Sequence, residues 1–136
     1  MSESLNHAPP AWLPKTIGAR TMAQAVDMAA AWRGDHPAVV DWARQVSYRD
    51  LAQSMRRSAA PFVRAGLKPG DRVAIWLHNS LEWVEASLGL QAAGGVLVPL
   101  NTRFKGAEAQ YAINKSGARF LVFSDYGRPS IRLAAL

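Results

Sequence analysis

The second half of the chain contains three short, nearly continuous apolar runs, which cover residues 72–77, 96–99 and 119–123. Runs of this length are typical of strands that are covered on both faces, as in a parallel sheet. Between successive runs lie segments long enough for a helix, residues 81–93 and 106–116, and such crossovers join parallel strands. The pattern predicts an α/β fold: part of a doubly wound, mainly parallel sheet with helices on both of its faces.

Both crossover segments carry residues that begin or end helices. Ser80 precedes the segment 81–93 as an N-cap, Gly94 follows it, and Gly117 is the expected C-cap of the segment 106–116. The segment 81–93 is apolar almost all round, which is typical of a helix that is buried on more than one side. We expect a chain of this length to offer too little partner surface to cover that helix.

The first half of the chain contains residues that predict a helix, followed by residues that predict a β-hairpin. Thr21 and Gln24 fit a capping box, which predicts a helix that begins near Met22. The apolar segments 38–42 and 46–47 predict the two strands of a small hairpin. This half of the chain is therefore expected to contain local structure that precedes the sheet.

The helix expected after the hairpin, about residues 48–65, has an apolar stripe on one side and arginines on the other. The arginine face consists of Arg49, Arg56, Arg57 and Arg64. Together with the net charge of +6, it raises nucleic acid as a partner. A solvated helix face and a phosphate-tracking patch both fit these arginines. No aromatic residue is interleaved with them for base stacking, so we favour the solvated face and predict no nucleic-acid partner.

The composition of the 136 residues, 49% hydrophobic and 19% charged, is that of a folded domain. The absence of cysteine excludes disulfides, a thiol nucleophile and thiolate metal ligands, and the three histidines lack zinc spacing. The longest apolar run, residues 88–100, is interrupted and shorter than the about 20 residues that cross a bilayer. Since the polar N-terminus does not resemble a secretory signal, we expect a soluble cytoplasmic protein with no transmembrane segment.

Polar residues follow each expected parallel strand, at the edge where open α/β sheets bind their ligands. They are His78-Asn79-Ser80, Asn101-Thr102-Arg103 and Ser124-Asp125. A functional interpretation makes His78 a base and Arg103 an anion clamp. Because a lone histidine is weak evidence for catalysis, we favour ordinary loop and capping roles for these residues. We assign no catalytic, cofactor-binding or metal-binding residue.

Known phosphate and nucleophile motifs do not fit the sequence. Gly89 and Gly94 have the spacing of a P-loop, but Gly95-Val96 follow where Lys and Ser or Thr are required. These glycines also lie late in an expected helix, whereas a P-loop precedes one so that free N–H groups face the phosphate. The sequence contains neither a GxGxxG motif after a strand nor a GxSxG elbow.

An ordered set of short motifs covers residues 68–125. The set comprises Gly70-Asp71-Arg72-Val73-Ala74, Asn79-Ser80 followed by Glu82-Trp83, Ala93-Gly94 before a strand ending Val98-Pro99-Leu100-Asn101, and Ser116-Gly117-Ala118. Upstream, the segment 46–51 (VSYRDL) fits a short strand that enters a long helix. The set resembles the N-terminal part of the acyl-CoA synthetases, which belong to the AMP-forming, acyl-adenylating ligase superfamily. The resemblance extends over about residues 20–125.

The resemblance implies a reaction in two steps. Members of the family use ATP, with magnesium, to convert a carboxylic acid such as a fatty acid into an acyl-adenylate, and the thiol of coenzyme A then attacks it. In the family, the Gly/Ser/Thr-rich triphosphate loop, the acidic residues and the catalytic lysine lie after the matched region. No such loop occurs in this chain. The resemblance therefore implies a structural part of the large N-terminal domain, with no cofactor bound by this fragment itself.

Three regions follow from the resemblance: an irregular lead-in (1–20), a partial ligase N-terminal domain (21–125) and a non-matching tail (126–136). We expect the chain to be a truncated acyl-CoA synthetase, a frameshift product or a fragment, and to be inactive alone. The alternative is a non-enzymatic α/β interaction module that binds a partner protein. Either could self-associate through exposed apolar surface.

Overall fold

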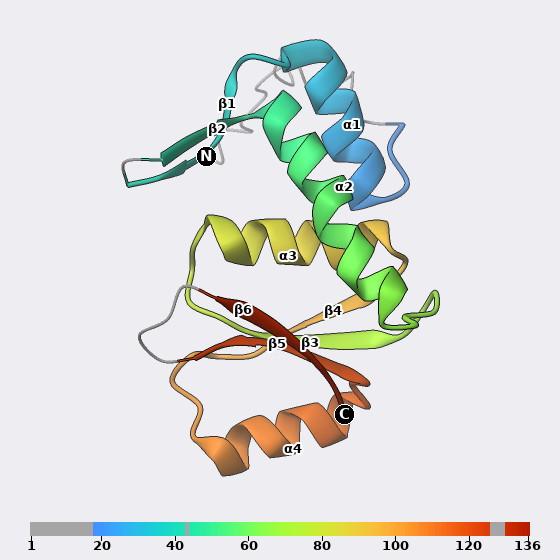
Figure 1. Cartoon of the computed structure of the whole chain (residues 1–136), viewed down its shortest axis with the longest axis vertical. Coiled ribbons are helices and arrows are strands. Elements are labelled where there is room, and N and C mark those ends of the chain that lie inside the picture. Colours follow the sequence, from blue (N-terminus) through green and yellow to red (C-terminus); the bar gives the residue numbers. More distant parts are fainter. Residues whose placement is uncertain (1–17, 43, 126–129) are drawn as a thin grey trace, which may run out of the picture.

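In a computed structural model of the protein, residues 18–42, 44–125 and 130–136 are described (Figure 1). The elements in chain order are α1 (Met22–Arg33), β1 (Pro37–Asp41), β2 (Arg44–Ser47), α2 (Tyr48–Arg64), β3 (Arg72–Trp76), α3 (Leu81–Ala92), β4 (Val96–Pro99), α4 (Gly106–Ser116), β5 (Phe120–Ser124) and β6 (Ile131–Ala135). The expected irregular lead-in lies outside the described residues, except for residues 18–20.

The larger sheet has the strand order β4-β3-β5-β6, with β3 and β5 at its centre. Val73 of β3 is in register with Leu97 of β4 on one side and with Phe120 of β5 on the other, and both pairings are parallel. The three strands predicted from the apolar runs therefore form one parallel unit, as expected.

Helices cover both faces of this sheet, with α3 on one face and α4 on the other (Figure 1). Val73 and Ile75 of β3 pack in one cluster with Leu90 of α3, whereas Ala74 packs in another with Ala109 of α4. The alternation arises because successive side chains of a strand point to opposite faces. The chain crosses from β3 to β4 and then returns past β3 to β5, so crossovers of one hand place the two helices on opposite faces. The predicted fold class is confirmed.

The helix α3 packs against both the sheet and α2. Its Leu90 is completely buried against the sheet, and its Leu88 packs with Met55 of α2 in a second cluster. At Gly89 the two helices touch, because a Cβ there would lie 2.6 Å from backbone and side-chain atoms of Ser58. The expectation that this chain cannot cover α3 is therefore wrong: its own α2 and β3 supply the two covering surfaces.

The last strand, β6, lies within the segment 126–136, the expected non-matching tail. Ile131–Ala135 pair antiparallel with β5, so that Val122 is in register with Leu133. Leu133 packs against the cluster that contains Phe120 and Val122. Residues 131–135 therefore belong to the fold, because an apolar strand beside β5 satisfies hydrogen bonds that the edge of β5 would otherwise expose.

The expected Thr21 cap and the expected hairpin are present in the first half of the chain, and Ser47 supplies a further cap. The hydroxyl of Thr21 accepts the N–H of Gln24 at 3.1 Å to begin α1. The hydroxyl of Ser47 accepts the N–H of Asp50 at 3.1 Å to begin α2. Between the two helices, β1 and β2 pair antiparallel. Together, α1, the hairpin, α2 and one side of α3 enclose the second hydrophobic cluster.

Candidate functional site

The carboxyl ends of β3 and β5 meet at a cavity of about 370 Å³. The residues that line it come from the hairpin, the loop after β3, α3, and the ends of β5 and β6: Arg44, Leu77, His78, Ser80, Glu82, Ser124 and Ile131. Because this edge is where open parallel sheets bind ligands, the cavity is the candidate site of the described residues. The structure thus brings together His78 and Ser80, which follow β3, and Ser124, which ends β5.

Arg103 lies apart from this group of residues. It follows β4, and it is not among the described residues that line the cavity. Its backbone N–H donates to the side-chain oxygen of Asn101 at 2.9 Å, so residue 103 helps to close the loop after β4. His78 is exposed at the rim. The structure therefore does not combine His78 and Arg103 into one constellation.

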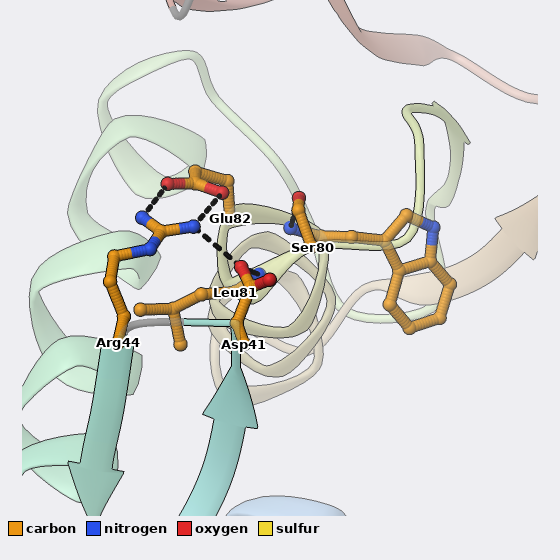
Figure 2. A network of polar contacts seen from close by, with 6 residues as sticks. Asp41, Arg44, Ser80, Leu81 and Glu82 are labelled. Carbon is orange, nitrogen blue, oxygen red and sulfur yellow. Dashed lines mark hydrogen bonds and ion pairs between the residues drawn. The ribbon is translucent and has the colours of Figure 1, made fainter.

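A charged network joins the hairpin to the start of α3 (Figure 2). The guanidinium of Arg44, at the start of β2, donates to both carboxylate oxygens of Glu82, with the longer contact at 3.1 Å. The same guanidinium donates to the carboxylate of Asp41, at the end of β1, at 2.5 Å. Figure 2 shows this guanidinium between the two carboxylates. We call Asp41, Arg44 and Glu82 the hairpin clasp.

The clasp also caps α3. The carboxylate of Asp41 accepts the backbone N–H of Leu81, the first residue of the helix, at 3.0 Å. The hydroxyl of Ser80 accepts the N–H of Trp83 at 3.2 Å, as predicted for an N-cap. Acidic groups at a helix N-terminus are favoured by its free N–H groups and its dipole. The strand-end loop is therefore held by one cap from its own sequence and one from the hairpin.

The clasp shifts the pKa values of its three side chains. The hydrogen bonds from Arg44 lower the pKa of Glu82 to about 2. The backbone N–H of Leu81, and then the guanidinium of Arg44, lower the pKa of Asp41. Glu82 and Asp41 in turn raise the pKa of Arg44. Each shift stabilises the charged form, because each charged group gains a hydrogen-bond partner.

The clasp limits what the cavity can bind. Arg44 is already engaged by two carboxylates, so it does not offer a free cation to a phosphate or carboxylate ligand. The described residues contain no group of three His, Asp or Glu side chains that could hold a metal ion. Within this cavity, Arg44 is therefore not free to bind a triphosphate.

Sequence reasoning found the loops of the site but missed the clasp. Asp41 and Arg44 carry opposite charges at the strand ends next to the hairpin turn, so their pairing could be predicted from the sequence. Glu82, however, is 38 residues from Arg44 in sequence, and no local spacing connects them. Glu82 lies in the first turn of α3, where an acidic side chain also complements the helix dipole.

The fold and the site together define part of a doubly wound α/β unit whose polar edge lies at the carboxyl ends of its parallel strands. A family model described as "AMP-binding enzyme" matches residues 26–134 of the chain. The chain belongs to this family. The match extends beyond residue 125 into the segment that was expected not to match.

Curated relatives of the chain are coenzyme A ligases. A 3-[(3aS,4S,7aS)-7a-methyl-1,5-dioxo-octahydro-1H-inden-4-yl]propanoyl:CoA ligase from Mycobacterium tuberculosis is 36% identical over 102 residues, which are 75% of this chain and 20% of the relative. A crotonobetaine/carnitine–CoA ligase from Proteus mirabilis is 41% identical over 86 residues, which are 63% of this chain and 17% of the relative. The chain thus spans about a fifth of the length of these relatives.

Solved structures of adenylating enzymes share the fold. The N-terminal subdomain of Klebsiella oxytoca NpsA, in complex with 3-hydroxyanthranilyl-AMSN, matches with a TM-score of 0.73 and 28% identity over 76% of this chain and 26% of that one. A putative long-chain-fatty-acid CoA ligase from Rhodopseudomonas palustris matches with a TM-score of 0.69 and 26% identity, at the same coverage. The predicted resemblance to the N-terminal part of AMP-forming ligases is confirmed. Among the described residues, no helix combines the length and apolarity needed to cross a membrane.

Proposed function

We propose that this chain is a structural part of the N-terminal subdomain of an acyl-CoA ligase. The single observation that carries the proposal is the family match over residues 26–134, which covers both the parallel sheet and its helices. In the complete enzyme, ATP and a carboxylic acid, a fatty acid or another acid, form an acyl-adenylate, which coenzyme A converts to a thioester. ATP, coenzyme A and magnesium are then cofactors or substrates of the complete enzyme. Because the cytoplasm supplies ATP and coenzyme A, we place that enzyme there.

Within that enzyme, the role we propose for this chain is that of a frame. The sheet and its two helix layers hold the strand ends, while groups that contact the nucleotide come from other parts of the enzyme. Two properties of the cavity support this role: Arg44 is neutralised by carboxylates, and the described part of the chain lacks a metal-ligand cluster. The isolated chain is therefore inactive in this proposal.

A chimera tests the proposal. Residues 26–125 of this chain would replace the matching segment of the crotonobetaine/carnitine–CoA ligase from Proteus mirabilis, and thioester formation would be measured. We expect an active chimera, and no release of AMP when the isolated chain is given ATP, carnitine and coenzyme A. A chimera that folds but is inactive would contradict the proposed frame role. AMP release by the isolated chain, absent from a mock preparation, would contradict its inactivity.

A second candidate function is a protein-interaction module. A largely apolar groove of about 680 Å³ runs along the outer side of α4, and its lining includes Phe104, Tyr111 and Ala112. Tyr111 is 67% exposed, which is unusual for a large aromatic side chain. Sedimentation velocity over a range of protein concentrations tests self-association through this groove. Association that Tyr111→Lys abolishes would favour the module, and a monomer at every concentration would argue against self-association.

A further inference from the structure

The hairpin clasp connects the tip of the hairpin to the start of α3. Asp41 is the last residue of β1 and Arg44 is the first residue of β2, so both lie at the tip of the hairpin. Their side chains nevertheless reach α3, whose first turn is about 40 residues away in the chain. Figure 2 shows the two strand ends directed towards Leu81 and Glu82.

We propose that Asp41 and Arg44 are positioning residues, through which the β1–β2 hairpin caps α3 and holds the loop at the carboxyl end of β3. The proposal concerns conformations of this chain and does not depend on the ligase function. It assigns to the hairpin a part in forming the candidate site, although the hairpin lies outside the sheet.

The backbone at the start of α3 requires hydrogen-bond acceptors from outside the helix. A helix begins with N–H groups that have no partner within the helix. Ser80 supplies acceptors for the groups of Trp83 and Val84, through its hydroxyl and its carbonyl oxygen. The N–H of Leu81 is bound instead by Asp41, and the residue itself is only 7% exposed. Without Asp41, this N–H would lose its acceptor in a position that water reaches poorly.

Arg44 holds two partly buried carboxylates together. The side chain of Asp41 is 17% exposed and that of Glu82 is 35% exposed, so two partly buried carboxylates face the same helix terminus. Two such charges repel each other, and a cation between them offsets this repulsion. Arg44 contacts both, and its planar group can donate to each carboxylate at once. Arg44 therefore keeps Asp41 where it can accept the N–H of Leu81.

The clasp also forms part of the wall of the cavity. Arg44 and Glu82 of the clasp line the cavity together with His78 and Ser80 of the loop between β3 and α3. This loop is fixed at one end by β3 and at the other by the first turn of α3. If the hairpin moved away, the cavity would lose the wall that Arg44 forms, and the loop would lose one of its two caps.

Amide hydrogen exchange of the full chain, followed residue by residue by NMR, tests the proposal. In Asp41→Ala we expect the amide of Leu81 to exchange about ten-fold faster, as for the loss of one hydrogen bond. The amide of Val73, in the centre of the sheet, is expected to accelerate less than that of Leu81. Asp41→Asn retains an acceptor oxygen and is expected to restore most of the protection. Glu85→Gln is the matched control, because Glu85 lies one turn further along α3 and its side chain takes no part in the contacts of the clasp.

Two results would overturn the proposal. One is an unchanged exchange rate at Leu81 in Asp41→Ala. The other is equal acceleration at Leu81 and Val73, which would mean general destabilisation. If Asp41→Ala does not fold, Arg44→Gln provides the same comparison: we expect exchange at Leu81 to accelerate several-fold and the NMR signals of His78 and Asn79 to shift, with Val73 affected less. Unmoved signals and an unchanged Leu81 rate in Arg44→Gln would contradict the role of the hairpin.

Discussion

At the scale of single residues, the close approach of α2 to α3 depends on Gly89. This residue lies in α3 where the helix meets α2, and a Cβ atom at this position would come within 2.6 Å of Ser58. Backbone atoms of Ser58 are among those approached, so a rotamer change cannot relieve the overlap. The glycine therefore allows α2 to pack on α3, and the P-loop spacing that it shares with Gly94 reflects helix packing.

Gly89→Ala is accordingly expected to destabilise the protein. Overpacking of a close contact costs about 1–3 kcal/mol, which would lower the midpoint of urea unfolding. The matched control is Gly106→Ala in α4, where an added Cβ would meet no atom within 4 Å. Equal unfolding midpoints for the two variants would show that α2 and α3 do not depend on this glycine.

A second prediction at this scale concerns acid. The pKa of Glu82 in the folded protein is about 2, against an ordinary value of 4.5, because Arg44 donates to its carboxylate. A lowered folded pKa contributes stability above the unfolded pKa, and this contribution is lost as the pH falls through the folded pKa. We therefore expect the free energy of unfolding to decrease between pH 4.5 and about 2, and to decrease less in Glu82→Gln.

Urea unfolding at a series of pH values measures this difference. Glu85→Gln serves as the control, because it removes a carboxyl group from the same helix without touching the clasp. If Glu82→Gln and Glu85→Gln gave parallel pH profiles, the ion pair with Arg44 would have no role in acid stability.

Helix caps were the most predictable residues. Thr21, Ser47 and Ser80 all accept the N–H groups that their sequence positions indicate. Capping depends on residues three positions apart, so one sequence contains all the information needed. The clasp could not be predicted in this way, since its geometry depends on how the hairpin packs on α3.

At the scale of elements, the strands of the parallel unit were predictable and β6 was not. The runs that became β3, β4 and β5 are continuously apolar because both faces of the sheet are covered. The strand β6, in contrast, contains Arg132, and three of its five residues are exposed. Its identity as a strand depends on pairing with β5, which a local pattern does not contain.

Removal of β6 is expected to expose apolar surface. A chain that ends at residue 125 would lose Leu133 from the core cluster and would leave the edge of β5 unpaired. We expect increased binding of the dye ANS, and a melting temperature lower by about 4–8 °C for each kcal/mol lost. The control lacks only Leu136, which is 60% exposed. Identical melting and dye binding by both truncated chains would show that β6 contributes nothing to the core.

At the scale of the whole molecule, the surplus of positive charge does not form a free binding stripe. Arg56 pairs with Asp27 of α1 at 2.5 Å, and Arg49 pairs with Asp35 at 3.2 Å. Two of the four arginines on the outer face of α2 are thus neutralised by acids that lie far from them in sequence. These pairs support the interpretation of a solvated helix face.

The corresponding prediction is that the chain does not bind DNA with measurable affinity. Fluorescence anisotropy of a labelled duplex, measured at low salt where phosphate contacts are strongest, provides the test. Binding that weakens steeply with salt, and that is lost in the double variant Arg57→Gln/Arg64→Gln, would identify a phosphate-tracking patch instead. Unchanged binding in that variant would place the contact elsewhere on the protein.

The cooperativity of unfolding follows from the position of α3, which contributes to two hydrophobic clusters. Leu90 belongs to the cluster on the sheet, and Leu88 belongs to the cluster that α1, α2 and the hairpin enclose. Neither cluster can lose this helix without exposing apolar surface of the other. The two halves of the described chain are therefore expected to melt in a single cooperative transition, and a probe in either half would report the same midpoint.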